Sequence, residues 1–320
     1  MKFSTILGAW APLFTAVLAH QSQLQEVKHS AHFSTGDFTS NNLVQVTNGG
    51  DHSNGQPYFM AYPQGTNFED VIKQSTGHTG DIVYNVYNAG PAPICLFGRS
   101  TNLQDGSSVE FRSNNAEGVP VPSNGTLQIR NIIPTGLGHK YNGIMYAREG
   151  CNEKCGECPG PAAVVNTLEE WTVSEDDKYW FDISLGRLSP LTKNSVMLMN
   201  VVDGYNHNLN VSVMNSNGLC NKNGTPRVCN ATLSEVQSVC PPENLWKSKN
   251  SWGCMSDCKR TNAVEHCAIG HGPYKPSSKF LKTLCPAAYS WAYDDHDSKS
   301  DVVDVCECVT AVNTIWSPIA

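Results

Sequence analysis

Charged residues are scarce in this chain: Lys, Arg, Asp and Glu together make up 16% of its 320 residues. The formal net charge is −7, and because binding to a phosphate backbone requires a basic surface, the composition excludes nucleic acid as a partner. Long amphipathic helical repeats are also scarce, whereas Gly, Pro, Asn and Ser recur throughout. This combination predicts a mainly β fold of short strands joined by many turns.

Long apolar runs are missing after residue 19, so no transmembrane segment is predicted. Residues 1–19 are typical of a secretory signal peptide, with Lys2 before an apolar core and Ala19 at the expected cleavage position. We therefore expect a secreted protein that is extracellular or in the cell wall. Four Asn-x-Ser/Thr sequons agree with secretion and predict N-glycosylation at Asn124, Asn210, Asn223 and Asn230.

Cysteine, in contrast, is abundant, with 13 residues between Cys95 and Cys308. In an oxidising compartment this density predicts a disulfide framework, and the odd number leaves at least one cysteine without a partner in the chain. The cluster Cys151, Cys155 and Cys158 could ligate zinc, but a tetrahedral site needs a fourth ligand and a second knuckle. We interpret the cluster as a disulfide-bounded loop and expect neither a metal nor another cofactor.

The rest of the chain divides into an arm and a main domain. Residues 20–80 are polar and turn-rich, and we interpret them as an N-terminal arm or pro-region that adds an edge strand to the main body. The main domain covers residues 81–320. Its first strands are expected at 81–88, 94–100, 108–113, 125–132 and 142–151.

Cysteines become dense within the main domain at about residues 215–285, which we interpret as a disulfide-rich loop module. Two short helices are expected there. One covers 231–240, with Thr232 or Ser234 as its cap, and the other covers 277–285, with Ser277 as its cap.

Two carboxylates, Asp182 and Asp203, close two apolar strand-like runs, as residues at the rim of a sheet do. Between them lies a turn-rich insertion at 187–201. Glu169 and Glu170 belong to an earlier strand at 166–173, and strand register decides which of them shares a face with the aspartates. Paired carboxyl groups are what cleavage of a glycosidic bond requires, one as acid and one as nucleophile or base.

Six ordered motifs resemble the thaumatin-like, or pathogenesis-related group 5, family. MYAREGC resembles I-W-x-R-T-x-C, NTLEEW resembles T-L-A-E-F, and WFDIS resembles Y-x-D-I/V-S. VVDGYNHNLNV resembles V-D-G-F/Y-N-x-P-M, GCMSDCKRTNAVEHC resembles G-C-x-x-x-C…Y-C-C, and CPAAYSWAYDD resembles C-P-x-A-Y-S-Y-x-x-D-D. The resemblance covers residues 81–320 and implies a thaumatin-like β-sandwich carrying a disulfide-rich module with short helices.

The resemblance also implies a set of disulfides. These pairs are Cys220–Cys306, Cys229–Cys285, Cys240–Cys254 and Cys258–Cys267. Two of the family's disulfides are absent as whole pairs, one near Gly90 and Ser317 and the other near Ala268 and His271. Of the remaining cysteines, Cys151 is expected to pair with Cys155 or Cys158, and Cys95 with Cys308 on an adjacent strand.

The family's acidic cleft, between the sandwich and the module, implies the site residues. Carried over one by one, they are Arg148, Glu170, Asp182, Asp203 and Asp294. A gapless match would place Arg187 at the second Asp position, but only Asp203 is followed by Gly204, Tyr205 and Asn206 as the motif requires. We expect Glu170 to be the catalytic acid and Asp203 or Asp182 the base or nucleophile, with Arg148 and Asp294 binding substrate.

Two functions remain open at this point. The resemblance implies a secreted monomer that acts on cell-wall β-1,3-glucan, as a weak endo-β-1,3-glucanase. The alternative is a carbohydrate-binding or antifungal defence protein whose acidic cleft binds wall polysaccharide without cleaving it.

Overall fold

The computed structural model describes part of the chain, mostly from residue 58 onward. The described residues are 44–46, 58–62, 64–75, 81–111, 118–130, 132–133, 138, 140–158, 165–174, 178–184, 187–188, 200–201, 204–215, 220, 226–247, 252–261, 263, 266, 278–290, 294 and 303–319. The signal peptide predicted at residues 1–19 lies outside them.

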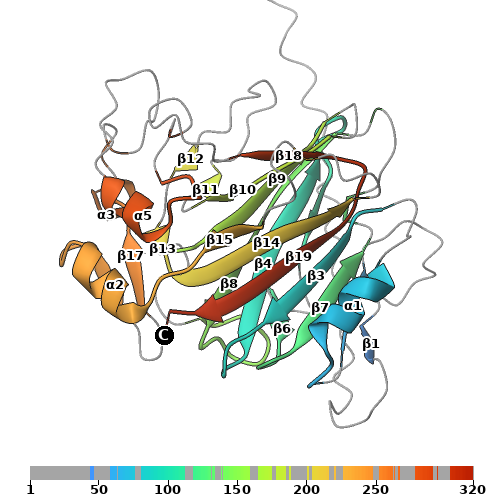
Figure 1. Cartoon of the computed structure of the whole chain (residues 1–320), viewed down its shortest axis with the longest axis horizontal. Helices are drawn as coiled ribbons and strands as arrows, with labels where there is room; N and C mark the ends of the chain where they lie inside the picture. The colour runs from blue at the N-terminus through green and yellow to red at the C-terminus, as the bar shows by residue number, and fades with distance from the viewer. Residues whose placement is uncertain are drawn as a thin grey trace, which may run out of the picture.

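Two sheets form the body of the molecule (Figure 1). Sheet I has the order β1-β2-β7-β3-β19-β14-β15, in which β3 and β19 pair in parallel and the other neighbours are antiparallel. Its strands are β1 (Val44–Val46), β2 (Tyr58–Ala61), β7 (Thr126–Arg130), β3 (Val83–Asn88), β19 (Val309–Pro318), β14 (His207–Asn215) and β15 (Arg227–Cys229).

Sheet II has the order β18-β10-β9-β8-β4-β5, and β6 also pairs with β4. Its strands are β18 (Asp304–Glu307), β10 (Lys178–Ser184), β9 (Leu168–Val173), β8 (Tyr141–Glu149), β4 (Ile94–Asn102), β5 (Ser108–Glu110) and β6 (Val119–Val121). All these pairs are antiparallel.

The core lies between the two sheets, because alternate residues of each strand point to the same face. Trp171 of β9 is central to it: its ring contacts Tyr84 from sheet I at 5.1 Å and stacks with Phe111 at 6.5 Å. Gly143 lies across from Trp171 on β8, where a Cβ would come within 2.2 Å of the indole ring. The prediction of a mainly β sandwich is therefore confirmed.

The disulfide-rich module lies at one end of the sandwich, where α2, α3 and α5 gather in Figure 1. It contains α2 (Leu233–Val239), α3 (Asp257–Thr261), α5 (Lys279–Leu284) and a three-stranded sheet of β13 (Gly204–Tyr205), β17 (Trp252–Met255) and β16 (Leu245–Lys247). Thr232 is the cap of α2, as predicted, and not Ser234. The prediction of Ser277 as the cap of α5 is wrong, since that helix begins one residue later and Ser278 occupies the cap position.

The stretch interpreted as an arm contributes regular structure. β2 pairs with β7 of sheet I, and β1 pairs with β2 at the edge of that sheet. Between β2 and β3 lies a helix that the sequence did not indicate, α1 (Phe68–Ser75). Val71 of α1 is fully buried, and Phe68 stacks on Tyr87 of β3 with ring centroids 5.2 Å apart. The helix therefore packs against the side of sheet I that faces away from the core.

Three of the implied disulfides are confirmed: Cys220–Cys306, Cys229–Cys285 and Cys240–Cys254. Cys151 bonds to Cys158, one of its two expected partners. Cys258 is also disulfide-bonded, while its expected partner Cys267 lies outside the described residues.

The pairing of Cys95 with Cys308 is wrong, because Cys95 bonds to Cys155. The sheet order explains the error. β4, which carries Cys95, is separated from β18 by β10, β9 and β8. Four strand spacings amount to about 19 Å, far beyond the reach of a disulfide, whose Cα atoms lie within about 7 Å. Cys308 follows β18, is exposed, and takes part in none of the five disulfides whose two cysteines both lie among the described residues.

The insertion between the two aspartate motifs begins and ends with two short strands that pair as a hairpin. β11 (Arg187–Leu188) pairs with β12 (Asn200–Val201), with Arg187 across from Val201. The residues between these two strands lie outside the described part. Closure of the hairpin at this point returns the chain to the motif VVDGYNHNLNV, which begins at Val201 and continues the family resemblance.

Candidate functional site

Glu170 and Asp182 occupy directly opposed positions on neighbouring strands of sheet II. Glu170 of β9 is the register partner of Asp182 on β10 and of Ile144 on β8. Glu170 is 4% exposed. The side chain of Asp182 lies outside the described part, so its placement rests on the strand register alone. The register places the two positions on the same face of the sheet.

Glu169 belongs to the opposite face. Its register partners are Met145 and Ile183, both fully buried in the core between the sheets, and Glu169 itself has no exposed surface. The strand register therefore shows that Glu170, and not Glu169, shares a face of the sheet with Asp182.

Arg148 extends the same face of sheet II along β8. It lies four residues beyond Ile144 and across from Cys95 of β4, and it is half-buried. Burial lowers the pKa of the Arg148 guanidinium, and the neighbouring Tyr146 hydroxyl partly offsets this effect. Arginine nevertheless keeps its charge in proteins, so Arg148 places a fixed positive charge on the face that carries Glu170.

Asp294 is fully buried and held in place by two donors. Its Oδ2 atom accepts hydrogen bonds from the Lys282 ammonium at 2.7 Å and from the Ser290 backbone N–H at 3.0 Å. Lys282 also donates to the Ala288 carbonyl at 2.9 Å. In this arrangement Asp294 ties α5 to the segment that follows Cys285. Asp203, the remaining predicted site residue, lies outside the described residues.

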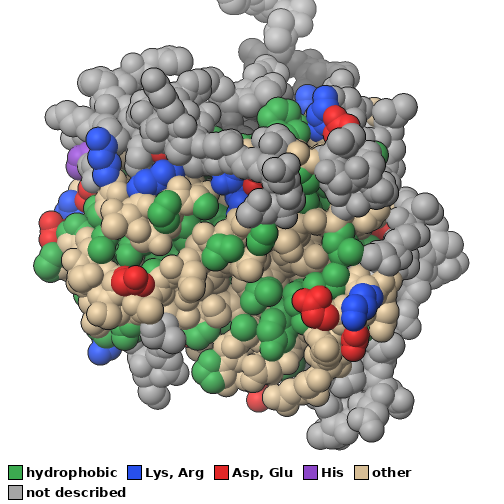
Figure 2. All heavy atoms as spheres, in the orientation of Figure 1, with side chains coloured by type: hydrophobic (Ala, Val, Ile, Leu, Met, Phe, Trp, Pro, Cys, Tyr) green, Lys and Arg blue, Asp and Glu red, His purple; other side chains and the backbone are tan. Residues whose placement is uncertain are grey.

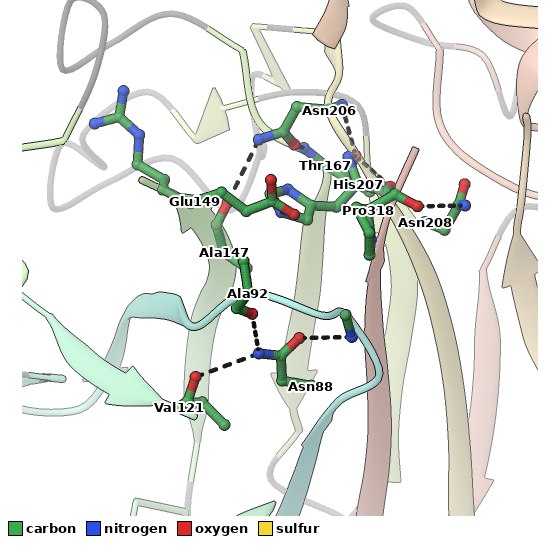
Figure 3. Close-up of polar contacts among 12 residues, drawn as sticks. Asn88, Ala92, Val121, Ala147, Glu149, Thr167, Asn206, His207, Asn208 and Pro318 are labelled. Carbon is green, nitrogen blue, oxygen red and sulfur yellow. Dashed lines mark hydrogen bonds and ion pairs between the residues drawn. The ribbon is translucent and has the colours of Figure 1, made fainter. Parts of the chain in front are cut away.

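The segment that begins at Gly204 is bound tightly to the strands of the site (Figure 3). Asn206 donates from Nδ2 to the Ala147 carbonyl at 3.4 Å and accepts from the Thr167 backbone N–H at 2.7 Å. Ala147 precedes Arg148 on β8, and Thr167 lies three residues before Glu170. One amide side chain thus links the strands of Arg148 and Glu170 to the segment that follows Asp203.

A buried His–Glu pair lies beside this link (Figure 3). The Nε2 atom of His207 is 3.6 Å from Oε1 of Glu149, and only 2% and 9% of the two side chains are exposed. The His207 backbone N–H and the Asn206 backbone N–H both donate to the Thr167 hydroxyl at 3.2 Å. Gly204 is required at the start of this segment, since it has φ +143 and a Cβ there would come within 2.1 Å of the Cys254 carbonyl oxygen.

Trp180 is an exposed aromatic residue that the sequence motifs did not indicate as part of the site. It lies two residues before Asp182 on β10 and across from Thr172 of β9, and it is 41% exposed. The alternation of side-chain directions along β10 could have indicated Trp180, because residues 180 and 182 of one strand lie on the same face as each other.

No group of three or more His, Cys, Asp or Glu side chains that could hold a metal ion occurs in the described part of the chain. Among the same residues, no helix is long and apolar enough to cross a membrane.

Comparison with known proteins identifies relatives in plants. "Pathogenesis-related protein 5" of Arabidopsis thaliana is 29% identical over 49% of this chain and 65% of its own length. "Pathogenesis-related thaumatin-like protein 3.2" of Cryptomeria japonica is 30% identical over 52% of this chain and 67% of its own. The chain thus spans about two thirds of the length of these relatives.

Among solved structures, a laminaripentaose-producing β-1,3-glucanase in complex with laminaritetraose matches with a TM-score of 0.34 and 12% identity, over 58% of this chain and 55% of that one. This likeness is too weak to support a conclusion. The sequence profile of the Thaumatin family, in contrast, matches residues 112–311, which is more than half of the chain. The chain belongs to the thaumatin family.

Proposed function

We propose that this protein is secreted and acts on β-1,3-glucan at the face of sheet II that carries Glu170, as a weak endo-β-1,3-glucanase. The observation that carries the proposal is the register of β9 and β10, which opposes Glu170 to Asp182 and leaves the Trp180 ring exposed two residues away. Sugar rings present apolar faces that stack on aromatic side chains, so Trp180 suits a polysaccharide ligand. The five disulfides support secretion, since such bonds persist in oxidising compartments.

In the proposed reaction, Glu170 protonates the oxygen of the leaving sugar. Asp182 or Asp203 acts on the anomeric carbon as nucleophile, or activates water as base. Arg148 binds and orients the sugar.

The register bears on the stereochemistry of hydrolysis. Directly opposed residues of antiparallel strands have Cβ atoms about 4.5–5.5 Å apart. Two carboxyl groups at about 5–5.5 Å are typical of retaining glycosidases, whereas inverting enzymes separate them by about 6.5–9.5 Å. The register fixes only the Cβ separation, so proton NMR of the first product from laminarin decides between the two courses: retention gives the β-anomer and inversion the α-anomer.

The test compares Glu170→Gln with Glu169→Gln in release of reducing sugar from laminarin. General acid catalysis contributes about 10²–10⁴-fold, so Glu170→Gln should lower kcat by that factor. Glu169→Gln is the register control: it changes a core residue, and its effect should appear in the melting temperature and not in kcat. Full turnover by the Glu170 variant would exclude this carboxyl group as the acid.

A second candidate function is glucan binding without cleavage. The exposed ring of Trp180 favours it, since an aromatic side chain can stack on a sugar ring without any catalytic acid. Co-sedimentation with insoluble β-1,3-glucan decides between the two. Binding by the wild type and by Glu170→Gln, with no sugar released by either, would establish the non-catalytic function.

A further inference from the structure

Three of the four sequons fall in a single hairpin of sheet I. Asn210 lies in β14, Asn230 directly follows β15, and Asn223 belongs to the connection between these strands, outside the described residues. The fourth, Asn124, lies in the turn between β6 and β7. This clustering is a feature of the fold that neither glucan binding nor glucan cleavage explains.

Asn210 and Asn230 both lie next to one exposed apolar residue, Val228. The register of β14 and β15 places Asn210 directly across from Val228, which corresponds to about 4.5–5.5 Å between Cβ atoms. Asn230 lies two residues beyond Val228, or about 7 Å along the chain. Arg227 and Cys229 are buried while Val228 and Asn230 are exposed, so both asparagines and the valine lie on the outer face of the hairpin.

Both acceptor amides are available for modification in the described structure. The side chain of Asn210 is half-exposed, that of Asn230 is exposed, and neither makes a hydrogen bond among the described contacts. Ser212, the hydroxyl residue of the first sequon, is also half-exposed and on the same face as Asn210. At the fourth sequon, in contrast, the Asn124 amide donates to the Ser123 hydroxyl at 3.3 Å and Thr126 is buried.

β15 is an edge strand whose outer face carries no charged side chain. It is the last strand of sheet I among those described, and Val228 on it is 44% exposed. Short length, inward-pointing charges and outward charges are among the features that keep edge strands from pairing with other chains. β15 has the first two, since it is three residues long and Arg227 points inward, where its Nε atom pairs with Oδ2 of Asp304 at 2.5 Å, but its outer face carries no charge. Figure 2 shows the same side of the molecule, with mostly uncharged side chains in the middle of this face.

We propose that Asn210 and Asn230 carry N-glycans and that these glycans shield β15 and Val228 from pairing with other chains. In each modification, the side-chain amide nitrogen forms a bond to the anomeric carbon of a lipid diphosphate-linked oligosaccharide. The bond from that carbon to the diphosphate breaks, the lipid diphosphate leaves, and a base of the transferase takes the amide proton. The hydrated sugars then supply the repulsion that outward charges supply on other edge strands.

The test begins with the protein secreted from a eukaryotic host. Peptide N-glycosidase in ¹⁸O-water, followed by mass spectrometry of peptides, should convert Asn210 and Asn230 to labelled Asp. The double variant Asn210→Gln/Asn230→Gln, which lacks both glycans and adds no charge, should show concentration-dependent association by light scattering, whereas the matched control Asn124→Gln should stay monomeric.

A third substitution tests the cause of association. Val228→Lys, added to the double variant, places a charge on the outer face of β15 and should restore the monomer. An unmodified Asn210 or Asn230 in the secreted protein would overturn the proposal. So would a double variant that stays monomeric over the whole concentration range, or association that Val228→Lys leaves unchanged. All these measurements are independent of activity on glucan.

Discussion

The hydroxyl groups of Tyr84 and Tyr179 meet in the core between the two sheets, where they share a hydrogen bond. Burial is the main cause that raises the pKa of Tyr84 well above its ordinary value, and Tyr179 and Glu169 raise it further. The neutral phenol is therefore strongly favoured in the folded protein. In the unfolded chain, the same group titrates near its ordinary pKa of about 10.

This difference predicts how stability falls in alkali. Below pH of about 10, both the folded and the unfolded chain keep the proton, and the contribution of Tyr84 is fully present. Above that pH the folded protein binds more protons than the unfolded chain, so the free energy of unfolding decreases as pH rises. Tyr84→Phe removes the titrating group. Urea unfolding between pH 9 and 11 should show a smaller loss of stability for this variant than for the wild type.

A suitable control is Tyr87→Phe, which changes the same residue type on the outer face of sheet I, where the ring is half-exposed. This variant should keep the alkaline dependence of the wild type. Equal slopes for the wild type and Tyr84→Phe would show that the buried phenol is not what makes the protein sensitive to alkali.

The residue types of the candidate site could be predicted from the sequence, whereas the sheet face on which each residue lies could not. The motif NTLEEW presents two adjacent glutamates, and only the pairing of β9 with β8 and β10 shows that Glu169 faces the core and Glu170 the opposite side. Register depends on which residues of three distant segments bury together, and a shift of one residue reverses both faces. Side-chain contacts such as that of Lys282 with Asp294 depend on tertiary packing in the same way.

At the scale of elements, α2 carries its start signal in its own sequence. Thr232 accepts from the Glu235 backbone N–H at 3.3 Å, and the Glu235 carboxylate accepts from the Thr232 backbone N–H at 2.7 Å. This reciprocal arrangement is a capping box, and it satisfies two backbone donors that a helix start would otherwise leave exposed. The hydrogen bond from the Thr232 backbone is also the largest cause that lowers the pKa of Glu235.

Loss of the cap should destabilise the protein by a measurable amount. Thr232→Ala should lower the free energy of unfolding by about 1 kcal/mol, whereas Thr232→Ser should keep it near the wild-type value. Thr232 also belongs to the sequon of Asn230, so the comparison requires unglycosylated protein. Asn230→Gln in the same background is the control for that position. Equal unfolding midpoints of the alanine and serine variants would contradict a role for the cap.

α1 shows why some elements could not be predicted from the sequence. Its residues, FEDVIKQS, follow a long polar stretch and amount to little more than two turns, too short for a helix to be stable alone. What holds it is tertiary: Val71 is buried and Phe68 stacks on Tyr87. The helix capped by Thr232 was predictable because its signal is local, whereas α1 depends on a sheet that forms from residues far away.

At the scale of the whole molecule, three of the disulfides are those that the family resemblance implies: Cys220–Cys306, Cys229–Cys285 and Cys240–Cys254. The bond between Cys95 and Cys155 ties β4 to the loop that Cys151 and Cys158 close. The loss near Gly90 and Ser317 has a counterpart in the fold. Ala89 donates its N–H to the Trp316 carbonyl at 2.8 Å, and a Cβ on Gly90 would lie 3.0 Å from Cδ of Pro318. The segments at residues 89–90 and 316–318 therefore still lie side by side, where the family resemblance implies a disulfide.

Restoring that link should stabilise the protein. Gly90→Cys with Pro318→Cys removes the ring atom nearest the new Cβ and closes a loop that contains nearly the whole domain. A disulfide of this kind typically adds about 2–4 kcal/mol by restricting the unfolded chain. Cys308→Asn should be included in every variant to prevent mispairing, since residue 308 has φ 52 and asparagine tolerates this conformation.

Differential scanning calorimetry should show a higher Tm for the variant with both substitutions than for Gly90→Cys or Pro318→Cys alone. The comparison is valid only if the new bond has formed, so peptide mapping without reduction must first recover a disulfide-linked pair of peptides from the two substituted positions. Reduction should then remove the gain in Tm over the single variants. A Tm at or below those of the single variants, with the bond formed, would mean that closing the gap strains the strands more than it restricts the unfolded chain.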